Sequence, residues 1–489
     1  MQIKGFMKKA GVHLFNRINF INTICTLIGL GVVLNFIIFG CNLAFDYPLG
    51  DQWRWLRGLL IPYINNDINF WQYISGEFGL LSHSHILTLL FMLLNFELFQ
   101  LRFDLDVYLG IGCYVLSAFI IFFYFKRICS KHYSNSYWGI LLVILTLVYF
   151  SLSSVTIFTW TLLSFELLYW LIAVVLLILY DQFILINCRP IPFLVWFIVV
   201  FFLGDAMGIT ALLTTILISA FLLLISPQKQ KLKIFILQIG ILVFCIIITI
   251  YLFPEKKHSA SKLSSLVYIV DNPVEAVHFI VNCFSQSIID QSGIKHFFGN
   301  HFKCVQLTIG TLVIILNVFC FYLYLIKKIY IRTTLPLAFL IFTIISISGI
   351  MLTRLSTFGP EYAFGNRYNR LFQPSFMFCL FVLGESLLLN SSSWDAICKK
   401  MFIFLFICVC MIQIGTTMFR WKYIGSQWKY QGCLIEETYD YYKTNSNERF
   451  DKLNPRCRNH FCDSSLTFLA EKKLSFFRED ILKKYQISK

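Results

Sequence analysis

Two acidic residues and two tryptophans follow the first long apolar run of the sequence, in the stretch CNLAFDYPLGDQWRWLRG. Asp46 and Asp51 would lie where that run leaves a membrane, with Trp53 and Trp55 directly behind Asp51. A carboxylate beside aromatic rings is partly removed from water, which suits a general base, and aromatic faces pack against sugar rings and lipid. Anchoring in the membrane interface is the simpler interpretation of the tryptophans. For Asp51 we favour a functional role, because the end of a loop does not require an acid.

The same segment continues into GEFGLLSHSH, which places Glu77, His83 and His85 close together. Two histidines two residues apart beside an acid could ligate a divalent metal, bind phosphate or relay a proton. The spacing differs from that of zinc motifs such as HExxH, so a metal is the weaker interpretation. The alternative to a functional site is a helix capped by Ser82 or Ser84, with the histidines in solvent.

A third polar stretch, RLSTFGPEYAFGNRYNRLFQP, occupies residues 354–374 between two long apolar runs. Guanidinium groups bind phosphate through paired donors, and the glycines allow tight turns toward a head group. The alternative is that the arginines only reach lipid head groups, with Arg367 paired to Glu361. We favour a phosphate site. Its expected ligands are Arg354, Arg367 and Arg370, and the expected substrate contacts are Trp53, Trp55, Glu77, Glu361, Tyr362 and Tyr368.

The apolar runs between these groups are long enough to cross a membrane. Hydrophobic residues make up 58% of the 489 residues, aromatic residues make up 18%, and the mean hydropathy is +0.71. A soluble domain could not bury so much apolar surface. Because a spanning helix needs roughly 20 apolar residues, the sequence predicts about eleven spans. They lie at residues 22–42, 106–125, 138–156, 163–180, 191–204, 207–225, 232–253, 304–326, 333–353, 374–390 and 401–418.

Residues 85–103 are a further apolar run that we do not count as a span. A twelfth span would reverse every later loop and place basic groups such as Lys229 and Lys327 outside. Asn95 and Glu97 in its middle would also need partners within a bundle. We therefore expect a re-entrant or interfacial helix there.

The formal net charge of +15 indicates membrane orientation rather than nucleic-acid binding. The cations form small groups beside apolar runs, and no basic, aromatic-interleaved domain is evident. With a cytoplasmic N-terminus, the predicted cytoplasmic segments hold sixteen lysines and arginines but only two acids, Asp181 and Asp395. Short cytoplasmic loops collect Lys and Arg, so this bias predicts the orientation.

The expected fold is an all-α polytopic transmembrane helix bundle with a small periplasmic C-terminal region. Residues 1–418 would form the membrane domain, with outward loops at 43–105, 254–303 and 354–373, and residues 419–489 would form a polar periplasmic tail. An oxidising periplasm would allow a disulfide in this tail, although the sequence does not determine the pairing. The tail cysteines are Cys433, Cys457 and Cys462.

This pattern resembles the GT-C superfamily, the polytopic glycosyltransferases that take sugar from a polyprenyl-phosphate donor. The resemblance rests on the first-loop acid, Asp46 or Asp51, on the LLSHSH stretch before the next helix, and on the outward GNRYNR loop. A polar C-terminal region outside the membrane adds to it. In size and outer regions the chain looks like the Gtr-type O-antigen glucosyltransferases of bacteria and prophages. The likeness covers most of the chain in layout but only short motifs in detail, and no DxD or paired-acid signature is present.

The resemblance implies transfer of one hexose, glucose in the Gtr-type enzymes, from undecaprenyl phosphate to O-antigen or a related saccharide at the periplasmic face of the bacterial inner membrane. Asp51 would deprotonate the acceptor hydroxyl, with Asp46 in reserve. Arg367 and Arg370 would neutralise the departing phosphate, which His83 and His85 could orient. The implied partners are the lipid-linked sugar donor, a lipid-linked or polymeric acceptor and membrane lipid. A divalent cation, Mg²⁺ or Mn²⁺, is left open.

Two other functions stay open. An O-antigen polymerase also has many spans and outward arginines, but it joins whole repeat units and would depend less on Asp51. A transporter or lipid-linked saccharide flippase places ionisable groups at mid-membrane in broken helices. Asp205, in FFLGDAMG between two short runs, favours that class. We expect Asp205 at an outer hairpin tip, lining the same cavity as the other polar groups.

Overall fold

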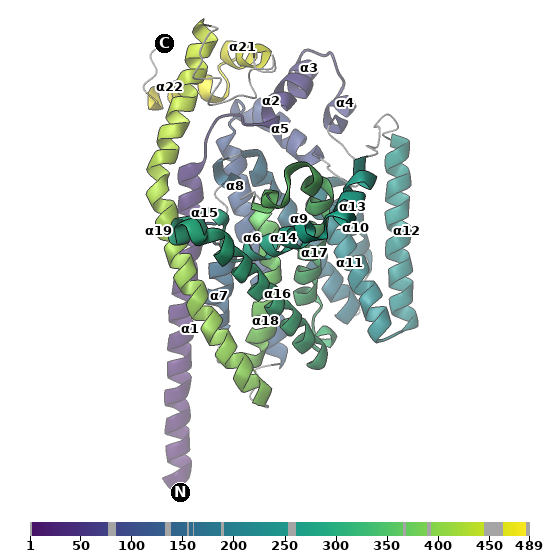
Figure 1. Cartoon of the computed structure of the whole chain (residues 1–489), viewed down its shortest axis with the longest axis vertical. Coiled ribbons are helices and arrows are strands. Elements are labelled where there is room, and N and C mark those ends of the chain that lie inside the picture. The colour runs from purple at the N-terminus through teal and green to yellow at the C-terminus, as the bar shows by residue number, and fades with distance from the viewer. Residues whose placement is uncertain are drawn as a thin grey trace.

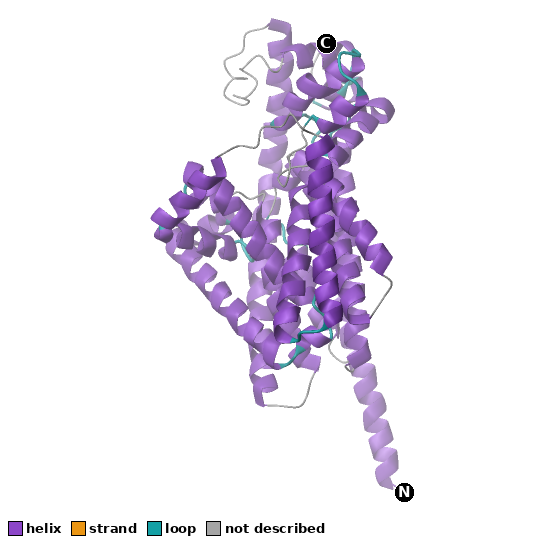
Figure 2. Ribbon diagram, turned by 90° about the vertical axis from the view of Figure 1, so that its right-hand side faces the viewer, coloured by secondary structure: helices purple, strands orange, loops and turns teal. Residues whose placement is uncertain are grey.

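The computed structural model of the chain describes residues 2–76, 85–132, 138–153, 156–159, 161–186, 190–252, 261–364, 368–388, 393–444 and 463–485. Across these ranges the secondary structure is helical and includes no β-strand (Figure 2). The predicted all-α fold is therefore confirmed.

A helix lies at each of the eleven ranges predicted to span. Eight of the helical segments are long and apolar enough to cross a membrane, and α7, α10 and α18 are not among them. A multi-pass helical bundle is thus confirmed, and the number of spans stays a prediction. The helices are α1 (Gln2–Leu43), α6 (Asp104–His132), α7 (Trp138–Tyr149), α9 (Thr161–Ile186), α10 (Pro190–Leu203), α11 (Asp205–Ile225), α12 (Lys229–Leu252), α16 (Phe302–Ile326), α17 (Leu335–Phe358), α18 (Asn369–Leu388) and α19 (Ser393–Thr444).

Helix α5 (Ile86–Phe99) occupies the run expected to be re-entrant or interfacial. It has 14 residues, and at 1.5 Å per residue its length of about 21 Å falls short of the ~30 Å hydrocarbon core. The Asn95 amide group donates to the Arg102 carbonyl, and the Asn95 carbonyl accepts from the Arg102 N–H, both at 2.7 Å. Glu97 is exposed. The local turn after α5 therefore satisfies Asn95, and α5 is too short to cross on its own.

The two chain ends lie at opposite ends of the molecule (Figure 1). We call the end that carries α2 (Asp51–Trp55), α3 (Ile61–Ile64), α4 (Phe70–Ser75), α21 (Asp463–Glu471) and α22 (Glu479–Lys484) the C-terminal side. The connections from α11 to α12 and from α16 to α17 lie toward the other end. Segments predicted to be outward and cytoplasmic are thus separated along the long axis.

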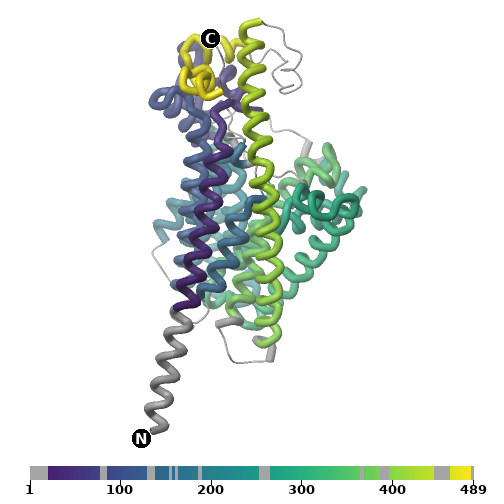
Figure 3. The backbone as a smooth tube through the Cα atoms, turned by 90° about the vertical axis from the view of Figure 1, so that its left-hand side faces the viewer, coloured from purple at the N-terminus to yellow at the C-terminus, as the bar shows by residue number. Residues whose placement is uncertain are grey.

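Helix α19 extends well beyond the span predicted to end at residue 418. It continues as one helix of 52 residues to Thr444 and runs beside α1 (Figure 3). Trp421 Nε1 donates to Asn35 Oδ1 at 2.9 Å, and Trp428 Nε1 donates to the Asn42 carbonyl at 2.8 Å. The first part of the expected tail is therefore an extension of the last long helix.

The first outward segment and the C-terminal region share one hydrophobic cluster on the C-terminal side. Its buried side chains include Tyr47, Trp53, Leu434 and Phe476. The ring centroids of Tyr47 and Phe476 are 4.9 Å apart, and the Tyr47 hydroxyl bonds to the Thr438 hydroxyl at 2.9 Å. Residues 45–103 and the C-terminal region thus build this layer together.

The other two outward segments also pack together. Helices α13 (Ser261–Asp271) and α14 (Pro273–Ser285) lie against the end of α17 and the 3₁₀ turn η5 (Pro360–Phe364). The Asn282 amide donates to the Pro360 carbonyl at 3.4 Å, and the Gln286 amide donates to the Ala363 carbonyl. Residues 268–288 and 347–372 share a second hydrophobic cluster.

Asp181, one of the two acids expected in cytoplasmic segments, is fully buried. Its carboxylate accepts from the hydroxyls of Tyr124, Thr333 and Thr334 at 2.8, 2.9 and 2.6 Å. It also accepts from the Thr334 N–H, directly before α17. Because an anion satisfies the free N–H groups at a helix start, Asp181 ties α9 to α6 and α17.

Candidate functional site

Asp51 is the first residue of α2 and is partly exposed. Gly50 precedes it with φ of 59°, in the left-handed region that glycine adopts without strain. The next residue, Gln52, is buried, and its Oε1 accepts from the Leu49 N–H at 2.9 Å. The turn that opens α2 is therefore fixed from inside, while Asp51 stays open to solvent.

Both tryptophans behind Asp51 are in the core rather than at a surface. Trp53 is 3% exposed and Trp55 is 1% exposed, so neither ring is open to a sugar or to lipid. The centroid of the Trp55 ring lies 4.9 Å from that of His85. The DQWRW and LLSHSH motifs therefore meet, although the intervening Glu77 and His83 lie outside the described residues.

Asp46 is not placed as a reserve base. Its side chain is 5% exposed and pairs with Arg478 Nη1 at 3.0 Å, and its Oδ1 accepts from the Phe103 N–H at 2.9 Å. Burial raises the pKa of Asp46 to about 7, with a further increase from Asp104, although Arg478 opposes the change. A pKa near 7 suits a base, but an acceptor hydroxyl has no access to this carboxyl group.

Arg370 is not placed to bind a donor phosphate. It is 6% exposed, and its Nη1 donates to the Tyr114 hydroxyl and the Tyr149 carbonyl at 2.8 and 2.5 Å. Its Nη2 donates to the Ser151 carbonyl at 2.9 Å. The guanidinium therefore holds the bundle together. Arg367, the other arginine of GNRYNR, lies outside the described residues.

The remaining residues of that stretch form a partly exposed aromatic group. The guanidinium carbon of Arg354 is 5.9 and 5.8 Å from the ring centroids of Phe358 and Tyr362, whose rings stack at 4.6 Å. The Tyr368 hydroxyl donates to the Tyr362 hydroxyl at 3.4 Å. Arg354, Tyr362 and Tyr368 are thus brought together as expected of neighbours in one site.

Glu361 pairs with Lys303, which was not among the predicted site residues. Lys303 Nζ lies 2.9 Å from Glu361 Oε1, with both side chains exposed. This hydrogen bond holds the pKa of Glu361 below its usual range. An exposed pair of this kind contributes little to stability.

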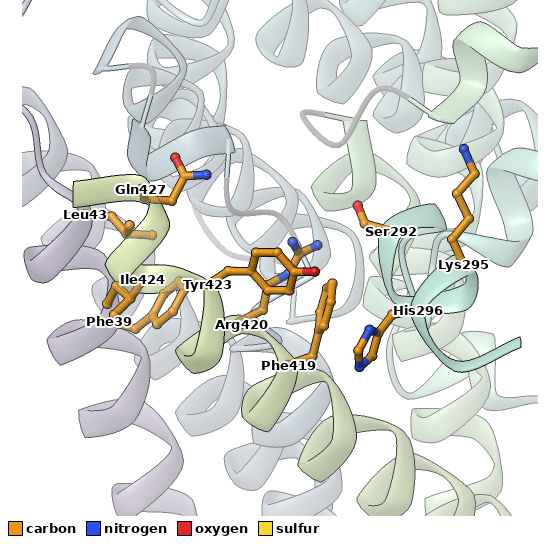
Figure 4. A pocket seen from close by; sticks show the side chains of 10 residues that line it. All are labelled: Phe39, Leu43, Ser292, Lys295, His296, Phe419, Arg420, Tyr423, Ile424 and Gln427. Carbon is orange, nitrogen blue, oxygen red and sulfur yellow. The ribbon is translucent and has the colours of Figure 1, made fainter. Parts of the chain in front are cut away.

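A pocket of about 440 Å³ opens where α1, α19 and α15 (Gln291–Phe298) meet (Figure 4). We call it the interface pocket. Its lining residues are Phe39, Leu43, Ser292, Lys295, His296, Phe419, Arg420, Tyr423, Ile424 and Gln427. None of these residues was predicted to belong to a functional site. The sequence feature that could have indicated this pocket is the basic, aromatic-rich stretch FRWKYIGSQWKY, which follows the last predicted span.

Arg420 is the charged residue at the base of this pocket. It is 9% exposed, and its Nη2 pairs with Asp290, which is fully buried, and donates to the Ser153 carbonyl at 3.3 Å. The centroids of the His296 and Phe419 rings are 4.3 Å apart (Figure 4). Because Asp290 and Ser153 hold Arg420, its position is defined before any ligand binds.

Glu166 is a second acid in the region of Asp205, and it was not among the predicted site residues. Asp205 opens α11 directly after Gly204, with φ of 51°, at the junction of α10 and α11 where a hairpin tip was expected. The Tyr169 hydroxyl bonds to the Thr88 hydroxyl at 2.6 Å and is within electrostatic reach of Asp205 and Glu166. Glu166 lies three residues before Tyr169 on α9, whereas only the fold brings Asp205 near this tyrosine.

Among the described residues, no three His, Cys, Asp or Glu side chains are grouped as metal ligands would be. Glu77 and His83 lie outside this part of the chain, and a divalent cation stays a prediction. Cys457 and Cys462 also lie outside it. Comparisons with protein families, characterised proteins and solved structures find no match to this chain.

Proposed function

We propose that the chain is an integral membrane glycosyltransferase of the GT-C type. It moves a hexose, glucose in our first assignment, from undecaprenyl phosphate to O-antigen or a related surface polysaccharide. The reaction takes place at the C-terminal side of the bundle, which we assign to the periplasmic face of a bacterial inner membrane.

The contact between Trp55 and His85 carries this proposal. Their rings join two of the three motifs on which the resemblance rests, with centroids 4.9 Å apart. Asp51 stands four residues before Trp55 on the same helix and is partly exposed. An accessible acid next to a histidine-containing segment supports acid–base chemistry at this surface.

Asp51 is the proposed base for the acceptor hydroxyl. Its carboxyl group is partly exposed at the start of α2. His83, His85 and Arg367 are the proposed contacts of the departing phosphate, whose charge grows in the transition state. Arg370 acts only indirectly, because its donors are occupied within the bundle.

An O-antigen polymerase is the second candidate. The cationic interface pocket favours it, since such polymerases rely on outward arginines and bind lipid-linked saccharides through phosphate. Asp51 separates the two functions, because only the one-sugar transferase requires it as a base.

The test is structural analysis of the surface polysaccharide from isogenic strains with and without this gene. A side-branch sugar that is present only with the gene supports the transferase. A change in chain length with unaltered repeat units contradicts it and supports the polymerase. Unchanged polysaccharide in both respects contradicts both functions.

A further inference from the structure

We propose that the interface pocket binds the phosphate head of an anionic membrane lipid, with the apolar part of the lipid against the end of α1 and the middle of α19. This site involves none of the residues assigned to the transfer reaction. The proposal therefore does not depend on the proposed function.

The pocket lies where the hydrocarbon core gives way to head groups. Phe39 and Leu43 belong to the last turns of the apolar segment of α1, which ends at Leu43. On α15, Phe297 and Phe298 are 45% and 47% exposed, directly after the basic Lys295 and His296. Exposed aromatic rings beside cations are typical of the membrane interface.

The polar wall offers donors to an anion. Asp290 balances the charge of Arg420, so the excess positive charge comes from the exposed Lys295. The buried Nε of Arg420 has no hydrogen-bond partner among the described residues. His296 and Ser292 add further polar groups to the lining. A phosphate with several acceptor oxygens matches such a set better than a carboxylate does.

The opposite wall explains why the ligand should be amphipathic. On the side formed by α1 and α19, Ile424 is partly exposed and Tyr423 is 47% exposed, whereas Phe39 and Leu43 are buried; Ser292, Lys295 and His296 come from the other side (Figure 4). A soluble anion gains nothing from the apolar side. Burial of lipid methylene groups against Ile424 and Tyr423 is favourable, because it removes apolar surface from water. Two lipids supply this chemistry, namely an anionic phospholipid and a polyprenyl phosphate.

The experiment is a lipid titration of the purified full-length chain in detergent, with bound lipid counted by native mass spectrometry. The probes are phosphatidylglycerol, undecaprenyl phosphate, phosphatidylcholine and inorganic phosphate. The test variant is the double substitution Lys295→Ala and His296→Ala, which changes two exposed side chains and should leave the fold intact. The matched control is Lys472→Ala, an exposed cation on the same side.

We expect the double variant to bind the anionic lipid at least about tenfold more weakly, the effect of roughly one charge-assisted hydrogen bond. Weaker binding of both anionic lipids supports a general phosphate site. Weakening of only one identifies phospholipid or polyprenyl phosphate as the ligand. Unchanged binding of both, or an equal loss in Lys472→Ala, overturns the proposal. Preference of the wild type for inorganic phosphate or phosphatidylcholine also overturns it. The assay needs no sugar transfer, so a chain that is not a transferase can still pass it.

Discussion

Arg370 and Arg420 come from different helices, yet both donate to carbonyls of the short turn that follows α7. Arg370 reaches the Tyr149 and Ser151 carbonyls, and Arg420 reaches the Ser153 carbonyl. Arg420 also has a carboxylate partner in Asp290, whereas the hydrogen bonds of Arg370 go to neutral acceptors. A buried cation is costly unless its donors are satisfied, and the planar fork of arginine can satisfy several at once.

We therefore predict that Arg370→Ala lowers the stability of the fold. The substitution leaves buried acceptors unpaired, at a cost of about 1–3 kcal/mol for each. Thermal unfolding in detergent can be followed by the reaction of buried cysteines, such as Cys283 and Cys379, with a thiol reagent. Arg354→Ala is the control and should have a smaller effect, because the Arg354 guanidinium lies over the rings of Phe358, which is exposed, and Tyr362, which is partly exposed. An Arg370→Ala protein with normal stability but weak donor binding would restore the phosphate-binding role.

The second prediction at this scale concerns Asp51. Asp51→Asn removes basicity at nearly constant shape and should reduce transfer by a factor of roughly 100 to 10,000, with normal amounts of protein in the membrane. Sugar transfer to acceptor saccharide in membranes is the measurement. Asp67→Asn, an exposed acid of the same segment, is the matched control and should keep full activity. Activity of Asp51→Asn within a few-fold of wild type would remove Asp51 from the mechanism.

Among the site residues, exposure is what the sequence could not predict. In the sequence, Asp46 and Asp51 both lie just after the first apolar run, and Arg367 and Arg370 lie three positions apart in one motif. The structure buries Asp46 against Arg478 and Arg370 against Tyr114, while Asp51 stays open. Partners more than 200 residues away decide these outcomes, and no local spacing encodes them.

At the scale of elements, apolar runs predicted helix positions well, because a helix in lipid satisfies its own backbone. They did not predict which outward segments pair. Residues 43–76 pack with the C-terminal region, and α14 packs with η5. The apolar runs also did not predict that the helix of the last span continues past residue 418 to Thr444. Aromatic side chains such as Trp421 and Trp428 hold this extension against α1.

Arg478 fastens the C-terminal segment to the first outward loop. It pairs with Asp46 at 3.0 Å and with Asp480 at 3.0 Å, and its side chain is 7% exposed. Loss of one partner of a buried ion pair commonly costs roughly 3–5 kcal/mol. We predict that Arg478→Gln releases residues 463–485. A protease specific for aromatic residues should then cleave this segment more than about tenfold faster than in the wild type.

The matched control for this prediction is Lys473→Gln. Lys473 lies 3.7 Å from Glu479 in an exposed pair, and such pairs contribute about 0–1 kcal/mol. Its cleavage rate should stay within a few-fold of wild type. Equal rates for Arg478→Gln and wild type would show that the hydrophobic cluster alone holds the segment.

At the scale of the whole molecule, the fold and the charge pattern give separate information about orientation. The start of α1 and the connection from α11 to α12 lie toward one end, and α21 and α22 lie at the other (Figure 1). The fold thus fixes which segments share a side. The basic groups predict which side is cytoplasmic, because Lys229, Lys231 and Lys233 follow the α11–α12 connection.

We predict that a reporter fused after residue 228 lies in the cytoplasm and that a reporter at the C-terminus lies in the periplasm. Alkaline phosphatase, active only outside, and a fluorescent protein that folds inside would be fused in turn at both positions. Phosphatase activity should appear only at the C-terminus and fluorescence only after residue 228. If both positions report the same side, the arrangement of helices across the membrane is wrong. If the sides are exchanged, the helices are placed correctly but Asp51 faces the cytoplasm, where a periplasmic saccharide acceptor could not reach it.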